Sequence, residues 1–200
     1  MLFRKKSNFT EDDLEAVIKA CLDNDSRAQR LLFQQFFSYA KSISLRYSSS
    51  MEEAEEILNE SFLKVFQHLE RYDMQQPFKA WLRTIVVNTA ISYYRKNQKF
   101  HGEIGLDNIT EPSLDTSVID QISAEEILGL VQQLKPIYRT VFTMHVVDGY
   151  QLREIADILN FNEATVRSHF ARARVRLQEL MKASYPFFFA EHSTNLFKQQ

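Results

Sequence analysis

Residues 151–182 read QLREIADILN FN EATVRSHFARARVRLQELMK, and their apolar spacing predicts two helices in succession. Apolar residues recur three or four positions apart, as they do along one side of a helix. In the first helix they are Leu152, Ile155, Ala156 and Leu159, and in the second they are Val166, Phe170, Ala173 and Leu177. Each helix is therefore expected to bury one face.

The break between these two helices is only Asn160-Phe161-Asn162. Asparagine tolerates the left-handed conformation that ends many helices, so Asn160 suits the end of the first. Asn162 is a good N-cap for the second helix, and Phe161 is expected to pack back onto Val166. Two helices joined by so short a turn form a helix–turn–helix.

Cationic side chains distinguish the second helix. The residues predicted to avoid its buried face are Arg167, Ser168, His169, Arg172, Arg174 and Arg176, and only Glu163 and Glu179 oppose them. Such a helix fits the DNA major groove, where early residues reach base edges and later arginines bind phosphate. The alternative is a solvated basic helix on an ordinary bundle. We favour DNA binding because the turn, the cap and the charge agree.

The composition predicts an all-α protein of one or two domains. Only 4 glycines and 4 prolines interrupt the 200 residues, and strand-like alternation is scarce. The single cysteine, Cys21, indicates a structural role in a reduced, cytoplasmic protein. Neither a signal peptide nor an apolar run of bilayer-spanning length is expected. The net charge of -2 predicts weak DNA binding by the chain alone, with a partner supplying the rest.

The N-terminal half is predicted to be a basic leader, residues 1–9, followed by helices. Thr10 is expected to cap the first helix. Asp23-Asn24-Asp25 is expected to be a turn, because it lacks the later glycine and acid of a calcium loop. A long apolar face follows in residues 48–72, where Ser50 and Glu53 are expected to form a capping box.

Glutamates cluster at the start of that long helix without a nearby base. They are Glu52, Glu53, Glu55, Glu56 and Glu60. The positive end of the helix dipole explains two or three of them. The rest form an acidic patch suited to a basic partner surface, and the sequence leaves the two explanations open. A metal-dependent enzyme could also use carboxylates, but no histidine pairing or Asp-x-Asp spacing supports one.

Residues 71–100 combine positive charge with aromatic rings. The cations are Arg71, Lys79, Arg83, Arg95, Lys96 and Lys99, and the rings are Tyr72, Phe78, Trp81, Tyr93, Tyr94 and Phe100. This mixture suits single-stranded DNA, whose bases stack on rings while cations follow the backbone. Most of the apolar residues, Trp81 included, are also explained as core. Asn88, Arg95, Lys96 and the loop Met74-Gln75-Gln76, which precedes a helix at about Phe78, are not.

The span from His101 to Leu134 contains no lysine or arginine. Its first two-thirds read as an acidic, flexible linker between two domains. Ser123 is expected to cap the helix that follows, and Pro136 is expected to start another that ends at Asp148-Gly149. The tail, with three consecutive phenylalanines at 187–189, docks either on the body or on a partner.

Three stretches in this order resemble the bacterial sigma-70 family, in its extracytoplasmic-function subgroup. EEAEEILNESFLKVF (52–66) resembles the family's polymerase-binding helix, and FKAWLRTIVVNTAISYYRK (78–96) its promoter-melting, minus-ten-reading helix. VDGYQLREIADILNFNEATVRSHFARAR (147–174) resembles its minus-thirty-five reader. The helix–turn–helix alone would not be specific, but the three motifs together are.

The resemblance implies a transcription initiation factor, not an enzyme, with no cofactor and no metal. Core RNA polymerase would bind Glu55, Glu56, Asn59 and Glu60. Melted minus-ten DNA would meet Met74, Gln75, Gln76, Trp81, Asn88, Arg95 and Lys96, and minus-thirty-five duplex would meet Thr165, Arg167, Ser168, His169, Arg172 and Arg174. The implied domains are 10–98 and 123–182, joined by a linker at 99–122 and followed by a tail at 183–200. An anti-sigma factor is a further expected partner.

Four positions depart from the family's pattern. Ser92 stands where aspartate is usual, His169 where arginine is usual, Gln151 where a serine usually caps, and Asn160 where the turn usually has glycine. Because histidine is shorter than arginine, the promoter sequence does not carry over. The competing hypotheses are a two-domain regulator that binds duplex DNA without polymerase, and a metal-dependent hydrolase that uses the glutamates.

Overall fold

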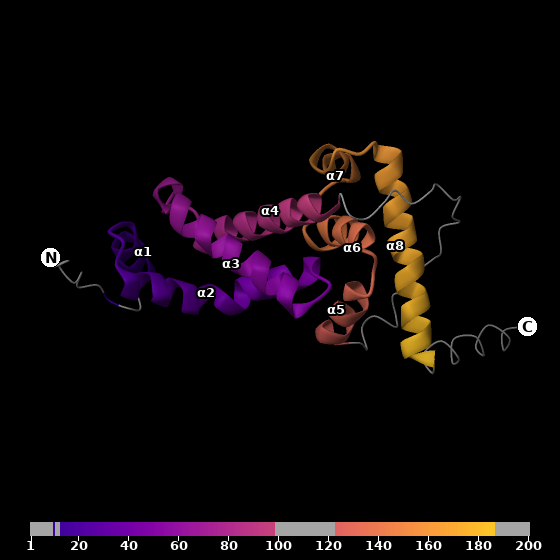
Figure 1. Ribbon diagram of the computed structural model, residues 1–200, viewed down its shortest axis with the longest axis horizontal. Coiled ribbons are helices and arrows are strands. Elements are labelled where there is room, and N and C mark those ends of the chain that lie inside the picture. Colours follow the sequence, from indigo (N-terminus) through magenta and orange to yellow (C-terminus); the bar gives the residue numbers. More distant parts are fainter. Residues whose placement is uncertain (1–9, 11–12, 99–122, 187–200) are drawn as a thin grey trace, which may run out of the picture. The chain divides into compact units, whose positions relative to one another are not determined.

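The computed structural model describes residue 10 and residues 13–98 and 123–186. Every regular element in these residues is a helix, so the all-α prediction is confirmed (Figure 1). The chain divides into two compact units, residues 1–93 and 94–200. None of the described helices combines the length and apolarity needed to cross a membrane. The predicted leader, the linker at 99–122 and the phenylalanines at 187–189 lie outside the described residues.

The first unit is built on α2. Its elements are α1 (Leu14–Leu22), α2 (Ser26–Tyr47), α3 (Met51–His68), a 3-10 turn (Leu69–Arg71) and most of α4 (Phe78–Gln98). Both α1 and α3 pack against α2, and the Phe36 and Phe78 rings, 4.7 Å apart, bring the start of α4 onto it. Cys21 is buried, and burial raises the pKa of its thiol to about 12, as befits a structural residue.

The helix starts in this unit only partly follow the prediction. Asp13, not Thr10, caps α1, and its Oδ1 accepts hydrogen bonds from the amides of Glu15 and Ala16. Thr10 contributes its carbonyl, which accepts from the Asp13 amide. The prediction failed because two capping residue types stand close together and the sequence does not decide between them. The turn at Asn24 is confirmed, with Asn24 at φ 58°.

The second unit packs shorter helices along α8. Its elements are α5 (Ala124–Gln132), α6 (Pro136–Phe142), a π-helical turn (η3, Thr143–Val147), α7 (Leu152–Leu159) and α8 (Glu163–Ser184). All three preceding α-helices contact α8, and Figure 1 shows them along its length. Ser123 caps α5 through a complete capping box, as predicted. Buried residues from α5, α6, α8 and the turn between α5 and α6, including Leu134, Tyr138 and Ala173, form one apolar cluster.

The turn of the helix–turn–helix has the predicted geometry. Asn160 adopts the left-handed conformation at φ 58°, ψ 44°. The Phe161 amide donates to the Ala156 carbonyl at 3.0 Å, which satisfies a carbonyl at the end of α7. Asn162 Oδ1 accepts from the Thr165 amide at 2.7 Å and so caps α8. These bonds fix the angle at which α8 leaves α7.

Arg139 is a buried cation that the sequence analysis did not single out. It is 1% exposed, and its Nη1 donates to the carbonyls of Gln132 at 2.8 Å and Leu134 at 3.4 Å. Gln132 is the last residue of α5, where carbonyls lack partners within the helix. Arg139 therefore joins α6 to the end of α5 and satisfies groups that would otherwise be buried without a hydrogen bond.

Candidate partner and nucleic-acid interfaces

The glutamates of α3 separate into two groups by what they touch. Glu53 Oε2 accepts from the amide and the hydroxyl of Ser49, both at 2.7 Å, while Ser50 Oγ accepts from the Glu53 amide. The expected capping box is thus half formed, since Glu53 returns to Ser49. Hydrogen bonds from its own amide and from the Ser50 hydroxyl lower the pKa of Glu52. Glu52 and Glu53 therefore stabilise the N-terminus of α3.

The remaining acidic residues form an exposed face further along α3. Glu55, Glu56, Asn59 and Glu60 are all exposed, whereas Ala54, Ile57 and Leu58 between them are buried. Within the described residues, the ion pair recorded on this face joins Glu60 to Lys64. Glu55 and Glu56 lie beyond the first turn, so the helix dipole does not explain them. The acidic face (Glu55, Glu56, Asn59 and Glu60) therefore suits a cationic partner.

A continuous stripe on α4 carries the predicted strand-reading residues. Trp81, Ile85, Asn88, Ser92 and Arg95 follow one another at intervals of three or four residues, and so share one side of the helix. Asn88, Ser92, Arg95 and the adjacent Lys96 are exposed. Trp81 and Ile85 are half-buried, so Trp81 belongs partly to the core and partly to the surface. The stripe offers a flat ring, that of Trp81, at one end and cations at the other.

The loop before α4 is exposed but held in place. Met74, Gln75 and Gln76 are exposed. Asp73 Oδ1 accepts from the Gln75 amide at 2.9 Å, and the Tyr72 hydroxyl donates to the Gln76 carbonyl. The Tyr72 ring also packs on Phe78 and Trp81, at 5.3 and 5.2 Å between centroids. Tyr72 therefore ties the loop to the Trp81 end of the stripe, a role that the sequence did not reveal.

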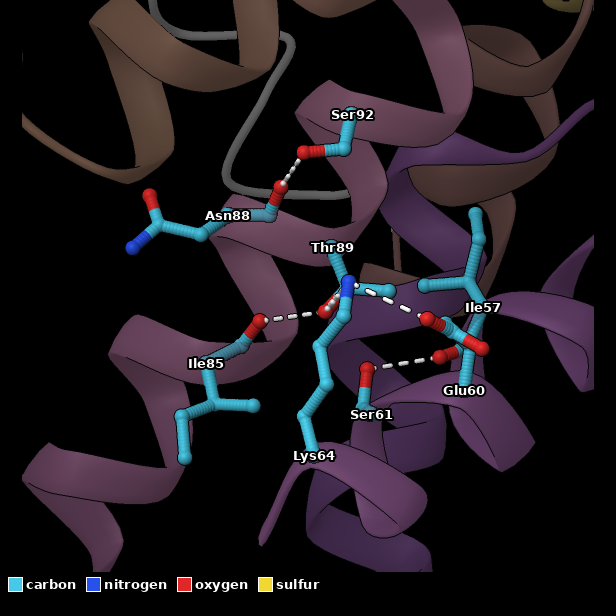
Figure 2. Close-up of polar contacts among 8 residues, drawn as sticks. All are labelled: Ile57, Glu60, Ser61, Lys64, Ile85, Asn88, Thr89 and Ser92. Atoms are coloured by element: carbon cyan, nitrogen blue, oxygen red, sulfur yellow. Dashed lines mark hydrogen bonds and ion pairs between the residues drawn. The ribbon is translucent and has the colours of Figure 1, made fainter. Parts of the chain in front are cut away.

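Lys64 joins α3 to α4. Its Nζ lies 3.3 Å from Glu60 Oε1 and donates to Thr89 Oγ1 at 3.4 Å (Figure 2). Thr89 is 2% exposed and is the immediate neighbour of Asn88 on α4. Sequence reasoning missed Lys64 because its partner in α4 is distant in the chain, and only the packing of the two helices brings them together.

The exposed side of α8 keeps part of the predicted DNA-reading set. Arg167 is exposed, and Thr165, Ser168 and Arg174 are half-buried. Glu163 accepts hydrogen bonds from Arg167, including one from Nε at 3.0 Å, and Glu179 pairs with Arg176 at 2.9 Å. The two acids of this helix thus each hold one arginine of the cationic face, in pairs that are exposed to solvent and weak.

His169 and Arg172 do not lie on the exposed face, so that part of the prediction is wrong. Each is only 8% exposed. The His169 ring lies 5.7 Å from the rings of both Tyr138 and Phe161, and Arg172 Nη1 donates to the Tyr138 hydroxyl at 3.5 Å. The spacing could have shown it for His169, which stands three residues after Val166 and four before Ala173, both buried. The Phe161 ring, which was expected to pack on Val166, contacts the His169 ring.

The described residues contain no group of three or more histidines, cysteines or acids that could hold a metal ion. The acidic face of α3 and the stripe of α4 as far as Ser92 lie in the first unit, and the cationic face of α8 lies in the second.

Comparison with known proteins agrees with this division. The model of sigma-70 region 2 matches residues 32–100, and that of sigma-70 region 4 matches residues 124–177. The ECF RNA polymerase sigma factor SigM of Bacillus subtilis is 27% identical over 154 residues, covering 74% of this chain and 92% of SigM. SigW of the same organism is 28% identical over 149 residues, covering 68% and 80%.

Among solved structures, the sigma factor RpoE from Bartonella quintana, in complex with the anti-sigma factor NepR, matches with a TM-score of 0.45 at 22% identity. The match covers 76% of this chain and 96% of that one.

The fold and the matched regions define a transcription initiation factor with two helical units. The two regional models together cover more than half of the chain, which belongs to the sigma-70 family of RNA polymerase sigma factors, in its ECF group. It directs RNA polymerase in transcription initiation.

Proposed function

We propose that this sigma factor docks on core polymerase through the acidic face of α3, melts promoter DNA and holds the minus-ten strand on α4. In the same proposal α8 reads the minus-thirty-five duplex. The observation that best supports it is the exposure of Glu55 and Glu56 on α3, because neither N-terminal capping nor the helix dipole accounts for acidic residues at these positions. The domain limits 10–98 and 123–182, with a linker at 99–122, belong to the same proposal.

The minus-ten strand would bind along the stripe of α4 and the loop before it. Asn88 would hydrogen-bond an unstacked base, and Trp81 with Met74, Gln75 and Gln76 would enclose it. Flipping a base out of the stack costs a few kcal/mol, so a braced pocket is needed to supply comparable contacts. The Tyr72 bond to the loop supports this role, since it holds the loop in place before DNA arrives. Arg95 and Lys96 would bind the strand's phosphates.

Minus-thirty-five duplex would bind the exposed side of α8. Thr165, Arg167 and Ser168 stand in its first two turns and are placed to reach base edges, with Arg174 placed for phosphate. His169 and Arg172 would act from behind the face, by packing α8 on Tyr138.

Three wider expectations accompany this proposal. The chain would have no catalytic activity of its own, because its role is to bring polymerase to DNA. It would act in the cytoplasm, where bacterial polymerase transcribes. An anti-sigma factor stays a prediction. RpoE of Bartonella quintana is one sigma factor captured with such a partner.

The decisive experiment is reversal of charge on the acidic face. Glu55→Lys/Glu56→Lys should weaken binding to core polymerase by about a hundredfold or more, since like charges across an interface are opposed by several kcal/mol. The matched control, Glu15→Lys/Glu70→Lys, makes the same charge change at exposed sites elsewhere in the first unit. Binding is measured by titrating labelled protein with core polymerase. Equal binding by both variants and the wild type would exclude the docking role.

The same titration separates the alternative of a duplex-binding regulator. Such a regulator would bind promoter duplex tightly as pure protein, with no change on addition of core polymerase. We expect the wild-type chain instead to open a start site only when polymerase is present.

A further inference from the structure

The ammonium group of Lys64 contacts side chains on both α3 and α4, the two helices of the first unit for which functions are proposed above. Lys64 stands on α3 with its side chain 32% exposed, and its Nζ contacts Glu60 on the acidic face and Thr89 on α4. Figure 2 shows the Asn88 side chain directed away from Lys64, to the other side of α4. Lys64 therefore cannot meet a base held by Asn88 and must act through the helix.

The hydrogen bonds around Thr89 have a defined direction. The Thr89 hydroxyl donates its one proton to the Ile85 carbonyl at 2.8 Å, so its oxygen accepts from Lys64. A chain of polar contacts thus runs from the Glu60 carboxylate through Lys64 and Thr89 to the α4 backbone (Figure 2). Thr89 is buried and adjacent to Asn88, so the contact with Lys64 lies at the helix turn that carries Asn88.

Both contacts of the ammonium are long. They measure 3.3 and 3.4 Å, whereas charge-assisted N–H···O bonds to carboxylates are about 2.7 to 2.9 Å. Lys64 is thus shared between two acceptors and saturates neither. The ammonium has donors for both acceptors, but Nζ is held between them. A cation from a docking partner that paired with the Glu60 carboxylate would weaken its attraction for Nζ, and Nζ would then move closer to Thr89.

We propose that Lys64 is a positioning residue that couples docking of polymerase at Glu60 to binding of the melted strand at Asn88, a role that rests on the function proposed above. Docking strengthens the Lys64 bond to Thr89 and so fixes α4 in its strand-binding position. Coupling of this kind is reciprocal, so bound strand raises affinity for polymerase by the same factor. An ordinary ion pair within α3 would stabilise the helix but would not link the two binding events.

The test measures the affinity of one fluorescent single-stranded DNA for the free chain and for the chain bound to core polymerase. The DNA is selected from a random pool with the wild-type holoenzyme. The coupling ratio is the first dissociation constant divided by the second. Lys64→Met should reduce this ratio about two- to fivefold, the range expected from loss of one partly exposed charged contact. Lys64→Arg should restore it.

Thr89→Val removes the acceptor at the other end of the contact and should reduce the ratio similarly, with no further loss in Lys64→Met/Thr89→Val. The matched control is Lys19→Met, which removes another lysine from an i,i+4 pair, with Glu15 on α1. It should leave the ratio unchanged. Thermal unfolding of each variant checks that the first unit is folded. If Lys64→Met does not fold, the coupling is tested with Thr89→Val instead.

Two results would overturn the coupling. One is an unchanged ratio in both Lys64→Met and Thr89→Val, and the other is an equal loss of DNA affinity in the free and bound states. If the wild-type chain itself bound no core polymerase, the docking role and the coupling would fall together. If the wild type bound both partners and only the ratios failed to move, the coupling alone would fall.

Discussion

At the scale of single residues, His169 is a buried titratable side chain of the second unit. It is 8% exposed between two aromatic rings, and its Nδ1 has no hydrogen-bond partner among the described residues. Burial, and then the positive charge of Arg172, lower the pKa of His169 below its ordinary value of about 6.5. The folded chain therefore favours neutral histidine, while the unfolded chain takes up a proton more readily.

This difference predicts how stability depends on pH. The contribution of His169 is present in full above about pH 6.5 and is lost as pH falls toward the folded-state pKa, at a slope of at most about 1.4 kcal/mol per pH unit. The free energy of unfolding, measured with urea at a series of pH values, should depend less steeply on pH in His169→Gln than in the wild type across this range. His68→Gln, at an exposed histidine on α3, is the control and should follow the wild type. Parallel pH profiles for all three proteins would contradict the assignment.

At the scale of elements, the turn between α7 and α8 sets where the cationic face points. Asn160 holds a left-handed conformation at φ 58°, which residues with a Cβ adopt at a cost of about 1 to 2 kcal/mol unless, like asparagine, they tolerate it. We expect Asn160→Ala to lower the free energy of unfolding by about 1 kcal/mol and Asn160→Gly to change it little. Chemical denaturation measures both.

A matched site elsewhere separates stability from recognition. Asn24, in the first unit, has the same φ of 58°. Asn24→Ala should lower stability by a similar amount without affecting binding to minus-thirty-five duplex, whereas Asn160→Ala should weaken that binding as well. Equal duplex binding by the two variants would show that the turn does not direct α8.

Elements with strong local signals could be predicted from the sequence, and those set by packing could not. Ser123 and Asn162 cap their helices as predicted, because the capping residue and its partner lie three residues apart in the chain. The π-helical turn at Thr143–Val147 was not predicted, since it depends on bonds such as the one from the Asp148 amide to the Thr143 carbonyl. His169 and Arg172 were misplaced because their polarity outweighed their position beside the buried face. Lys64 and Tyr72 needed the tertiary structure, as their partners come from other elements or from the loop backbone.

At the scale of the whole molecule, 24 basic residues are set against 26 acidic ones, so DNA attraction depends on where the cations lie. The proposed DNA contacts fall on two separate helices, with Arg95 on α4 and Arg174 on α8. Contacts made at such separate sites should contribute independently to binding. Salt dependence measures them one at a time, because each neutralised phosphate releases counterions.

We therefore expect the two arginines to be distinguishable on two probes with the polymerase-bound chain. Arg174→Gln should reduce the slope of log affinity against log salt by about 0.9 on duplex DNA and leave it unchanged on single strands. Arg95→Gln should reduce it by about 0.7 on single-stranded DNA and leave the duplex slope unchanged. Lys19→Gln, which removes a charge on α1 outside both surfaces, should alter neither slope. If either arginine variant lowered both slopes alike, duplex and melted strand would share one binding surface, and the assignment of each to its own helix would be wrong.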